Sequence, residues 1–198
     1  NNYYIPRIKW TKDSSLLSVQ LLNRPQNKLD LILVDVSNNN ATSLLHQESD
    51  DAYVSVNDDL TFLKNNKFIW TSEKSGWNHI YLYDENGKNE QQITSGSWEV
   101  ASYYGFDENR GVLFYNSTQN GSINRDVYSV SLKGKKTKRL TLKTGFNNAS
   151  FSKDFSYFIN TYSSATIPYT YTLNESKNGK VVREIKNNKD LVNKLKEY

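Results

Sequence analysis

The chain has 198 residues with a formal net charge of +4, and 13% of its residues are aromatic. This aromatic content excludes an intrinsically disordered chain, in which such residues are scarce, and no apolar run reaches the about 18 residues that a membrane-spanning helix needs. The absence of cysteine excludes disulfides, thiol catalysis and cysteine-based zinc sites.

The first part of the chain is predicted to form four strands separated by turn residues. Bulky side chains recur at alternate positions, which is typical of strands in a sheet. The expected strands lie at residues 3–11, 15–22, 29–36 and 42–47. Residues 53–59 form the longest interruption of the pattern, so this segment is the best candidate for a functional loop.

The second part is organised around residues 75–87, which we interpret as an inner strand followed by a tight turn. Every position of residues 80–83 is bulky, so the strand is expected to be covered on both faces. Asn86 and Gly87 predict a type I′ hairpin turn, because both residues tolerate the positive φ that this turn requires. Partner strands are expected at residues 67–72 and 90–94.

Two further groups of strands complete the chain. The third group is expected at residues 103–107, 111–116, 127–131 and 138–141, and the fourth at residues 149–154, 157–162, 169–174 and 181–185. Residues 191–195 then carry apolar side chains at helical spacing, and Asp190 lies where it would cap a helix. A short helix or a linker is therefore predicted over residues 188–198.

The four groups repeat one pattern of a strand, a tight turn and a return strand. The equivalent strand ends are Asp35, Asp84, Ser131 and Asn174, which lie roughly 40–50 residues apart. Four strands per unit at this spacing are typical of a propeller blade. The predicted fold is all-β, a partial β-propeller of about four consecutive four-stranded antiparallel blades, with limits near residues 1–50, 51–98, 99–146 and 147–187.

The sequence offers little for covalent catalysis. Of the two histidines, His46 ends a predicted strand, and His79 lies inside one, where a packed residue is more common than a general base. The Gly-x-Ser-x-Gly signature of a serine hydrolase is absent, and no spacing matches a zinc site or a glycine-rich phosphate loop. We therefore predict neither a metal nor another cofactor, and the residues favour a binding or shielding module.

The charged segments also have simple interpretations. The acidic residues of the first long loop lack the spacing of a calcium site and are interpreted as solvated: Asp50, Asp51, Asp58 and Asp59. Five basic residues gather at residues 133–139, but the other lysines are scattered. A nucleic-acid interface needs the charge collected on one face, so we expect no nucleic-acid partner.

Several segments carry a resemblance to a known family. They include Ser-Gly-Trp-Asn-His-Ile-Tyr at residues 75–81 and Gly-Ser-Trp-Glu-Val at residues 96–100, with further similar segments at residues 4–11, 27–31, 168–170 and 188–191. In this order they resemble the dipeptidyl peptidase IV family, within the prolyl oligopeptidase group of serine peptidases. Since the chain also lacks methionine, we interpret it as a mature or excised piece of a longer protein.

The resemblance implies a fold and a parent activity. In that family an eight-bladed propeller caps an α/β-hydrolase domain, and the enzyme releases N-terminal dipeptides with Pro or Ala as the second residue. This chain resembles the C-terminal half of that propeller, which gates access to the active site and shapes the substrate cavity. The related tripeptidyl peptidases share the propeller, so the length of the released peptide stays open.

The resemblance also implies where the chemistry lies. The paired glutamates that hold the substrate's amino terminus are expected before residue 1, and the catalytic Ser, Asp and His after residue 198. No catalytic residue is therefore assigned to this chain, which alone is not expected to be an enzyme. Its expected partners are the hydrolase domain of the same parent and peptide substrates, and its expected location is outside the cytoplasm, in a bacterial periplasm or at a cell surface.

One loop is the candidate for a substrate contact. The family has an aromatic and basic cluster near this loop, whereas this sequence lacks the corresponding Phe and Arg. The residues expected to line the cavity are Tyr53, Asn57, Asp58 and Asp59. The alternative function is a free-standing propeller-like module that binds a protein or a glycan.

An open propeller also predicts exposed end faces. Residues around Ile8, Trp10 and Leu17 are expected at one end, and residues around Phe151, Phe158 and Tyr171 at the other. Large apolar patches rarely stay exposed on a monomer, so the chain is expected either to form a homodimer or to bury these faces in crystal contacts.

Overall fold

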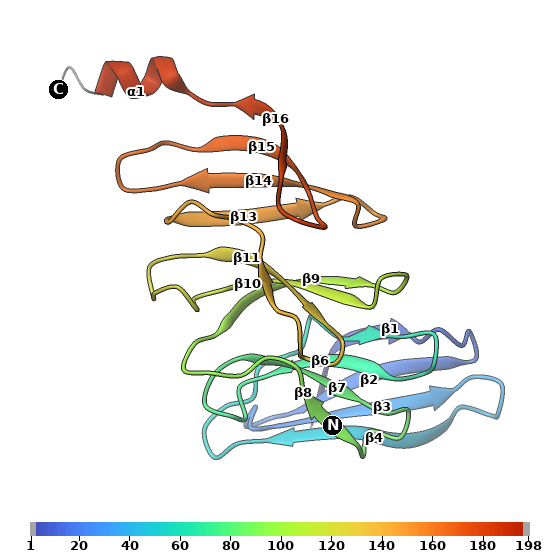
Figure 1. Ribbon diagram of the computed structural model, residues 1–198. Helices are drawn as coiled ribbons and strands as arrows, with labels where there is room; N and C mark the ends of the chain where they lie inside the picture. The colour runs from blue at the N-terminus through green and yellow to red at the C-terminus, as the bar shows by residue number, and fades with distance from the viewer. Residues whose placement is uncertain (1–2, 196–198) are drawn as a thin grey trace. The chain divides into compact units, whose positions relative to one another are not determined.

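The computed structural model describes residues 3–195 and contains sixteen β-strands and one α-helix, arranged as four separate four-stranded sheets (Figure 1). Every strand pair whose register is resolved within a sheet is antiparallel. The prediction of an all-β partial propeller with a short C-terminal helix is confirmed.

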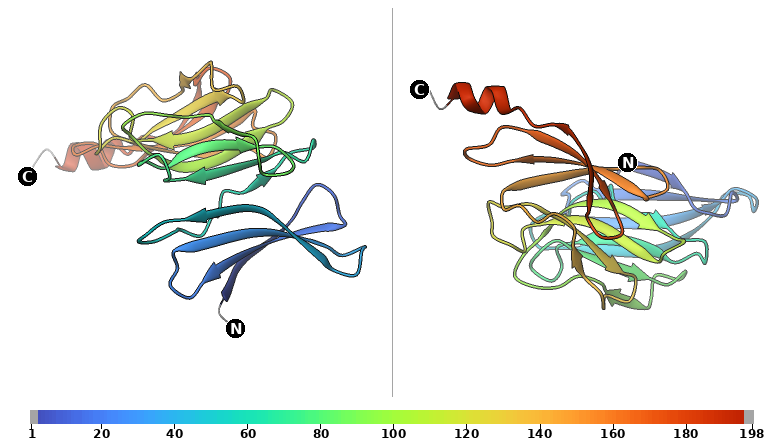
Figure 2. Two further views of the ribbon diagram at one scale, coloured as in Figure 1. Left: turned by 90° about the horizontal axis from the view of Figure 1, so that it is seen from below. Right: turned by 45° about the horizontal axis from the view of Figure 1, so that its top comes forward.

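The first sheet has the strand order β1-β2-β3-β4 and is strongly twisted (Figure 2). Its strands are β1 (Tyr3–Trp10), β2 (Leu16–Asn23), β3 (Lys28–Asp35) and β4 (Ala41–Ser49). The register between β1 and β2 shifts between Tyr4 and Arg7. Pro6 lies inside this irregularity, where its missing N–H costs no ladder hydrogen bond.

The second sheet has the order β5-β6-β7-β8, with β5 (Thr61–Phe62), β6 (Phe68–Ser72), β7 (His79–Tyr83) and β8 (Glu90–Gln92). All five residues of β7 are buried, which confirms that this strand is covered on both faces.

The predicted type I′ turn after β7 is wrong. Gly87 has a φ of 68°, but Asn86 is not among the residues with positive φ. The Asp84 carboxylate accepts the N–H groups of Asn86 and Lys88, at 3.1 and 2.9 Å, and Gly87 donates to the Asp84 carbonyl at 3.0 Å. These local bonds favour a type I turn followed by glycine in the left-handed region.

The third sheet has the order β12-β11-β10-β9. Its strands are β9 (Val100–Asp107), β10 (Val112–Ser117), β11 (Asp126–Ser131) and β12 (Lys138–Arg139). The ladder between β9 and β10 is interrupted twice, between Phe114 and Tyr115 and between Asn116 and Ser117. Such irregularities change the direction of nearby side chains.

The fourth sheet has the order β13-β14-β15-β16, with β13 (Phe146–Phe151), β14 (Tyr157–Ser163), β15 (Thr170–Glu175) and β16 (Val181–Lys186). The helix α1 (Lys189–Leu195) follows and buries no residue. This one helix of residues 3–195 is too short to cross a membrane. Residues 1–2 of the first predicted blade and residues 196–198 of the predicted terminal helix lie outside the described residues.

The chain divides into two compact units. Unit 1 comprises Asn1–Thr71 and Tyr81–Gln91, and unit 2 comprises Ser72–Ile80 and Gln92–Tyr198. The core of unit 1 is built from buried leucines and aromatic rings, including Leu29, Leu31, Phe68, Trp70 and Tyr81.

In unit 2 the third and fourth sheets lie face to face (Figures 1 and 2). Phe114, Val127, Leu140 and Phe158 form the buried core of this unit, and the Phe114 and Phe151 rings lie 4.6 Å apart. The expectation that Phe158 belongs to an exposed end face is therefore wrong, because Phe158 is only 1% exposed. Ile8 and Trp10 on β1 are exposed as expected, and on β16 the exposed apolar residues are Val181, Val182 and Ile185.

Candidate functional site

The predicted cavity loop, residues 53–59, lies in unit 1, and three of its members, Tyr53, Ser55 and Asp58, are exposed. Tyr53 is 55% exposed. Asp58 is also exposed, and its carboxylate accepts hydrogen bonds from the Arg7 guanidinium, one of them from Nη2 at 3.2 Å. The hydrogen bond from Arg7 lowers the pKa of Asp58 below its ordinary value. The first strand of the chain thus holds this part of the loop.

Asn57 faces inward instead. It is only 6% exposed, and the Gln20 side chain binds its backbone twice, donating to its carbonyl at 2.6 Å and accepting its N–H at 3.1 Å. The Asn57 amide donates to the Thr71 carbonyl at 2.7 Å. The Thr71 hydroxyl also donates to Asp59, whose pKa is raised by burial. Asn57 and Asp59 therefore anchor the loop, and a substrate contact at these four residues stays a prediction.

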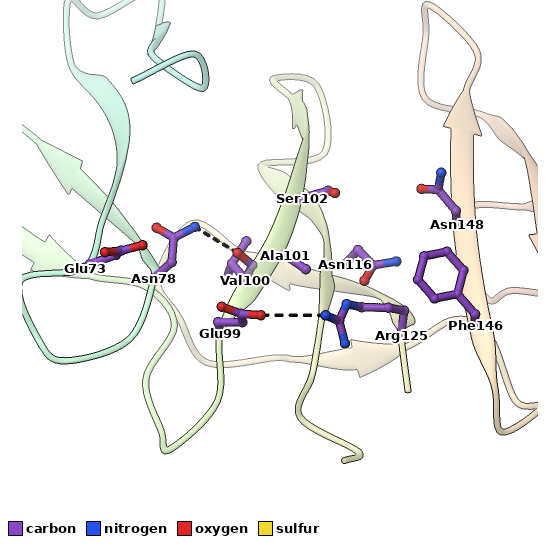
Figure 3. A pocket seen from close by; sticks show the side chains of 10 residues that line it. All are labelled: Glu73, Asn78, Glu99, Val100, Ala101, Ser102, Asn116, Arg125, Phe146 and Asn148. Carbon is purple, nitrogen blue, oxygen red and sulfur yellow. Dashed lines mark hydrogen bonds and ion pairs between the residues drawn. The ribbon is translucent and has the colours of Figure 1, made fainter. Parts of the chain in front are cut away.

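A second candidate site is a cavity of about 450 Å³ that lies entirely in unit 2. Figure 3 shows side chains from three sheets around it. Glu73 and Asn78 come from the turn between β6 and β7, Glu99 directly precedes β9, and Arg125 directly precedes β11. The remaining polar side chains of the wall are Ser102 on β9, Asn116 on β10 and Asn148 on β13.

Backbone pairing fixes the left side of this cavity as drawn in Figure 3. Asn78 and Val100 exchange two hydrogen bonds of 2.8 Å, from the Asn78 side chain to the Val100 carbonyl and from the Val100 N–H to the Asn78 carbonyl. Glu99 is held in the same way by Thr118, which accepts the Glu99 N–H at 3.0 Å and donates to the Glu99 carbonyl at 3.1 Å. These backbone contacts leave the Glu99 carboxylate on the cavity wall.

Arg125 closes the lower edge of the cavity in Figure 3. Its Nη1 donates to the carbonyls of Ser122 and Asn124, at 2.8 and 2.9 Å, and its Nη2 lies 3.7 Å from the Glu99 carboxylate. Its backbone forms a parallel bridge with Phe146. The guanidinium is thus oriented by three acceptors of the chain itself.

A hydrogen-bond network forms the right side. The Tyr104 hydroxyl donates to Asn148 Oδ1 at 2.6 Å and accepts hydrogen bonds from Asn116 Nδ2 at 3.2 Å and from the Ala149 N–H at 3.1 Å. Burial raises the pKa of Tyr104, which keeps this donor protonated. Asn116 Nδ2 also donates to the Asn147 carbonyl at 2.6 Å.

Neither histidine belongs to this cavity. His79 is 1% exposed and contacts the Thr94 hydroxyl and the Gly96 carbonyl, each at 3.1 Å, and burial lowers its pKa. His46 packs against the Tyr83 ring at 4.4 Å in unit 1. The interpretation of His79 as a packed residue is confirmed. Over residues 3–195 no group of three or more His, Asp or Glu side chains is placed to hold a metal ion.

The chemistry of the cavity is therefore that of binding, with carboxylates, amides and one guanidinium on its wall. Sequence reasoning missed its principal residues, Glu73, Glu99, Asn116 and Arg125. The sequence marked two residues of the cavity, because Asn78 and Glu99 lie in the Gly-Trp-Asn-His and Gly-x-Trp-Glu-Val segments that carry the family resemblance. The other members had no such signal.

Comparison with known proteins gives consistent matches over nearly the whole chain. A family model described as "Dipeptidyl peptidase IV (DPP IV) N-terminal region" matches residues 1–169. A relative from Aspergillus flavus named "Probable dipeptidyl peptidase 4" is 30% identical over an alignment that covers 98% of this chain and 26% of that protein. The relative from Trichophyton rubrum named "Dipeptidyl peptidase 4" is 27% identical, covering 100% of this chain and 26% of that protein.

The structural comparison agrees with the sequence comparison. The crystal structure of Porphyromonas gingivalis dipeptidyl peptidase 4 superposes with a TM-score of 0.90 and 38% identity, over 99% of this chain and 28% of that one. The chain thus spans 26% of the length of each of these two curated relatives.

Proposed function

Since the chain belongs to the family of dipeptidyl peptidase IV N-terminal regions, we propose that it is a propeller segment of a serine-type dipeptidyl peptidase. The observation that carries this proposal is the match of residues 1–169 to the family. The TM-score of 0.90 to the Porphyromonas gingivalis enzyme supports it. The tripeptidyl relatives remain the alternative for the length of the released peptide.

The proposed role of the segment is steric and not covalent. The four sheets serve as consecutive blades, with limits near residues 1–50, 51–98, 99–146 and 147–187, followed by a terminal helix or linker at residues 188–198. A propeller admits flexible peptides through a narrow passage and excludes folded chains by size. In this proposal the loop with Tyr53, Asn57, Asp58 and Asp59 shapes the cavity wall.

The covalent chemistry belongs to the rest of the parent in this proposal. A C-terminal α/β-hydrolase domain supplies the catalytic Ser, Asp and His, and the parent releases Xaa-Pro and Xaa-Ala dipeptides from peptide N-termini. The proposed location is outside the cytoplasm, in a bacterial periplasm or at a cell surface.

Turnover of a Gly-Pro chromogenic amide tests the proposal. The protein from the complete reading frame is compared with the 198-residue chain alone, and a Ser→Ala variant of the downstream Gly-x-Ser-x-Gly signature is the control. We expect turnover only by the complete protein with its serine intact. Serine-inhibitor-sensitive turnover by the isolated chain, or a reading frame without a hydrolase domain, would contradict the proposal. The second outcome favours the free-standing binding module.

We also propose that the isolated chain forms a homodimer through its exposed apolar strands. Ile8 and Trp10 are 63% and 55% exposed on β1, and Val182 and Ile185 are 50% and 47% exposed on β16. Light scattering over a range of concentrations measures the mass. A concentration-dependent increase that Ile8→Lys or Val182→Lys abolishes supports the proposal, whereas a constant monomer mass refutes it.

A further inference from the structure

The cavity of unit 2 contains a buried hydrogen-bond acceptor without a partner. Asn116 is only 3% exposed, and among the described residues its Oδ1 atom accepts no hydrogen bond. Buried polar atoms of native proteins are almost always paired. Other buried side-chain atoms of the described residues, such as Asn160 Oδ1, are also unpaired, but Asn116 is the one whose residue lines this cavity, so a bound group can supply the missing donor.

The orientation of this amide is fixed by its other half. Asn116 Nδ2 donates to the Asn147 carbonyl at 2.6 Å and to the Tyr104 hydroxyl at 3.2 Å, so both of its hydrogens are used. A carbonyl oxygen can only accept, so exchanging Oδ1 with Nδ2 would bring two acceptors together. In Figure 3 the amide nitrogen points toward the strand that carries Asn148, and the oxygen points away from it.

The surrounding charges favour a cation. Two carboxylates, from Glu73 and Glu99, line the cavity, and the Glu99 side chain is 43% exposed. The single guanidinium, from Arg125, is already oriented by two carbonyls and by Glu99. Two carboxylates and one guanidinium give the wall a formal charge of −1.

An aromatic ring completes this environment. Phe146 lines the same cavity and is 45% exposed. The face of an exposed aromatic ring attracts an ammonium or guanidinium group. An anion would instead meet two carboxylates and an unpaired amide oxygen, with Arg125 as the one cationic side chain of the wall to oppose them.

We propose that this cavity, the acceptor pocket (Glu73, Asn78, Glu99, Asn116, Arg125 and Phe146), binds an ammonium or guanidinium group of a peptide. The ligand group donates to Asn116 Oδ1 and Glu99 while its alkyl stem lies against Phe146. The cationic chemistry follows from the pocket alone. The choice of a peptide as the carrier rests on the function proposed above.

Binding of blocked pentapeptides to the ¹⁵N-labelled 198-residue chain tests the proposal by NMR. The probe is acetyl-Ala-Ala-Lys-Ala-Ala-amide, and its matched control carries norleucine in place of lysine. We expect the lysine peptide to shift the amide signals of Glu99, Ala101 and Arg125 saturably, with a dissociation constant of about 1 mM, as a single weak contact gives. An unblocked norleucine peptide then shows whether an α-ammonium group serves equally well as the source of the cation.

Two variants localise the contact. Glu99→Gln keeps the shape of the side chain and should weaken binding of the lysine peptide at least fivefold, while Glu184→Gln on the exposed strand β16 should leave it unchanged. Asn116→Ala should abolish binding. Because that substitution also removes two donated hydrogen bonds, Glu99→Gln decides the question if Asn116→Ala does not fold. The affinity should also fall with added salt, which screens exposed charges.

Equal binding of the lysine and norleucine peptides would overturn the proposal. So would the absence of saturable shifts up to about 20 mM peptide, well above the expected dissociation constant, or an equal loss in Glu99→Gln and Glu184→Gln. None of these results affects the peptidase assignment, which is tested by turnover of the complete protein.

Discussion

Asn147 connects the third and fourth sheets, and its replacement by aspartate is the most informative test of how unit 2 is held together. The residue is 1% exposed. Its Nδ2 lies 3.2 Å from Asp126 Oδ1 and 3.0 Å from each of the carbonyls of Arg125 and Lys143. Its Oδ1 accepts a hydrogen bond from Asn160 at 3.1 Å. Asn147→Asp keeps the size of the side chain but replaces its donor by an acceptor.

The expected cost follows from the distance to Asp126. Two unit charges 3.2 Å apart repel by about 5 kcal/mol at an effective dielectric constant of about 20. The introduced carboxyl avoids this repulsion by keeping its proton. At pH 7 that costs about 4 kcal/mol, because each pH unit above its ordinary pKa of about 3.9 costs about 1.4 kcal/mol. The smaller of the two values sets the expected loss, about 4 kcal/mol of the free energy of unfolding.

The pH dependence provides a second, independent check. The introduced carboxyl has a higher pKa in the folded than in the unfolded state, so the folded variant binds more protons and its cost decreases as the pH falls. Between pH 7 and pH 5 the difference from the unmodified chain should shrink by about 2.7 kcal/mol. Urea unfolding followed by tryptophan fluorescence at both pH values measures it.

The matched control is the neighbouring residue. The Asn148 Oδ1 atom already acts as an acceptor, for the Tyr104 hydroxyl at 2.6 Å and the Ala149 N–H at 3.0 Å, and the residue is exposed. Asn148→Asp should therefore change the unfolding free energy by less than about 0.5 kcal/mol. A loss below about 1 kcal/mol for Asn147→Asp at pH 7, or a loss that does not decrease at pH 5, would refute the reasoning.

Three further predictions concern stability. Arg139→Met removes the cation 2.9 Å from the fully buried Asp126 and should lower the free energy of unfolding in urea by about 3 kcal/mol. Adding Asp126→Asn to the same chain should restore more than about 1 kcal/mol of this loss, and an equal loss in the single and the double variant would contradict the prediction. Gly87→Ala should cost about 2–3 kcal/mol, because its φ is 68° and a Cβ would lie 1.8 Å from a β4 carbonyl oxygen, whereas Gly111→Ala, at φ 64° with open space, should cost about 1 kcal/mol. Burial lowers the pKa of His79 below its ordinary 6.5, so the stability that the neutral ring contributes is complete above that pH and is lost as the pH falls. His79→Gln should therefore flatten the pH dependence of the unfolding free energy between about pH 7 and pH 5, and an unchanged slope of that dependence would argue against it.

Much of the fold could be predicted because its signals are local. Bulky side chains at alternate positions, with turn residues at a regular spacing, predicted the four sheets. The bulky residues 80–83 indicated the strand that is buried on both faces. The turn after that strand was wrongly predicted as type I′. Asn86 and Gly87 tolerate positive φ, but the side chain of Asp84 binds two N–H groups of the turn and favours another geometry.

The candidate sites could not be predicted as well, because they depend on contacts between distant residues. Asn57 lies in a polar run that is typical of a solvated loop, yet Gln20, on another strand, binds its backbone and helps to bury it. In the acceptor pocket, Glu99 directly precedes β9 and Asn116 lies on β10, and the β9–β10 ladder has a register shift on each side of Tyr115 and Asn116, which sets where Asn116 points. A register shift cannot be identified from residue types alone.

The buried asparagines of unit 2 explain how a polar pocket and a firm sheet-to-sheet contact coexist. Asn116, Asn147 and Asn160 lie on β10, β13 and β14. Asn116 donates to the Asn147 carbonyl, Asn147 donates to Asp126 on β11, and Asn160 donates to Asn147 Oδ1. An amide can donate and accept at once, so one chain of such bonds satisfies buried groups on both sheets. Within the described residues Asn116 Oδ1 accepts no hydrogen bond, and neither does Asn160 Oδ1 at the other end of this chain of bonds. Of the unpaired acceptors in this network, Asn116 Oδ1 is the one whose residue lines the cavity, where a bound donor would pair it without rearranging the sheets.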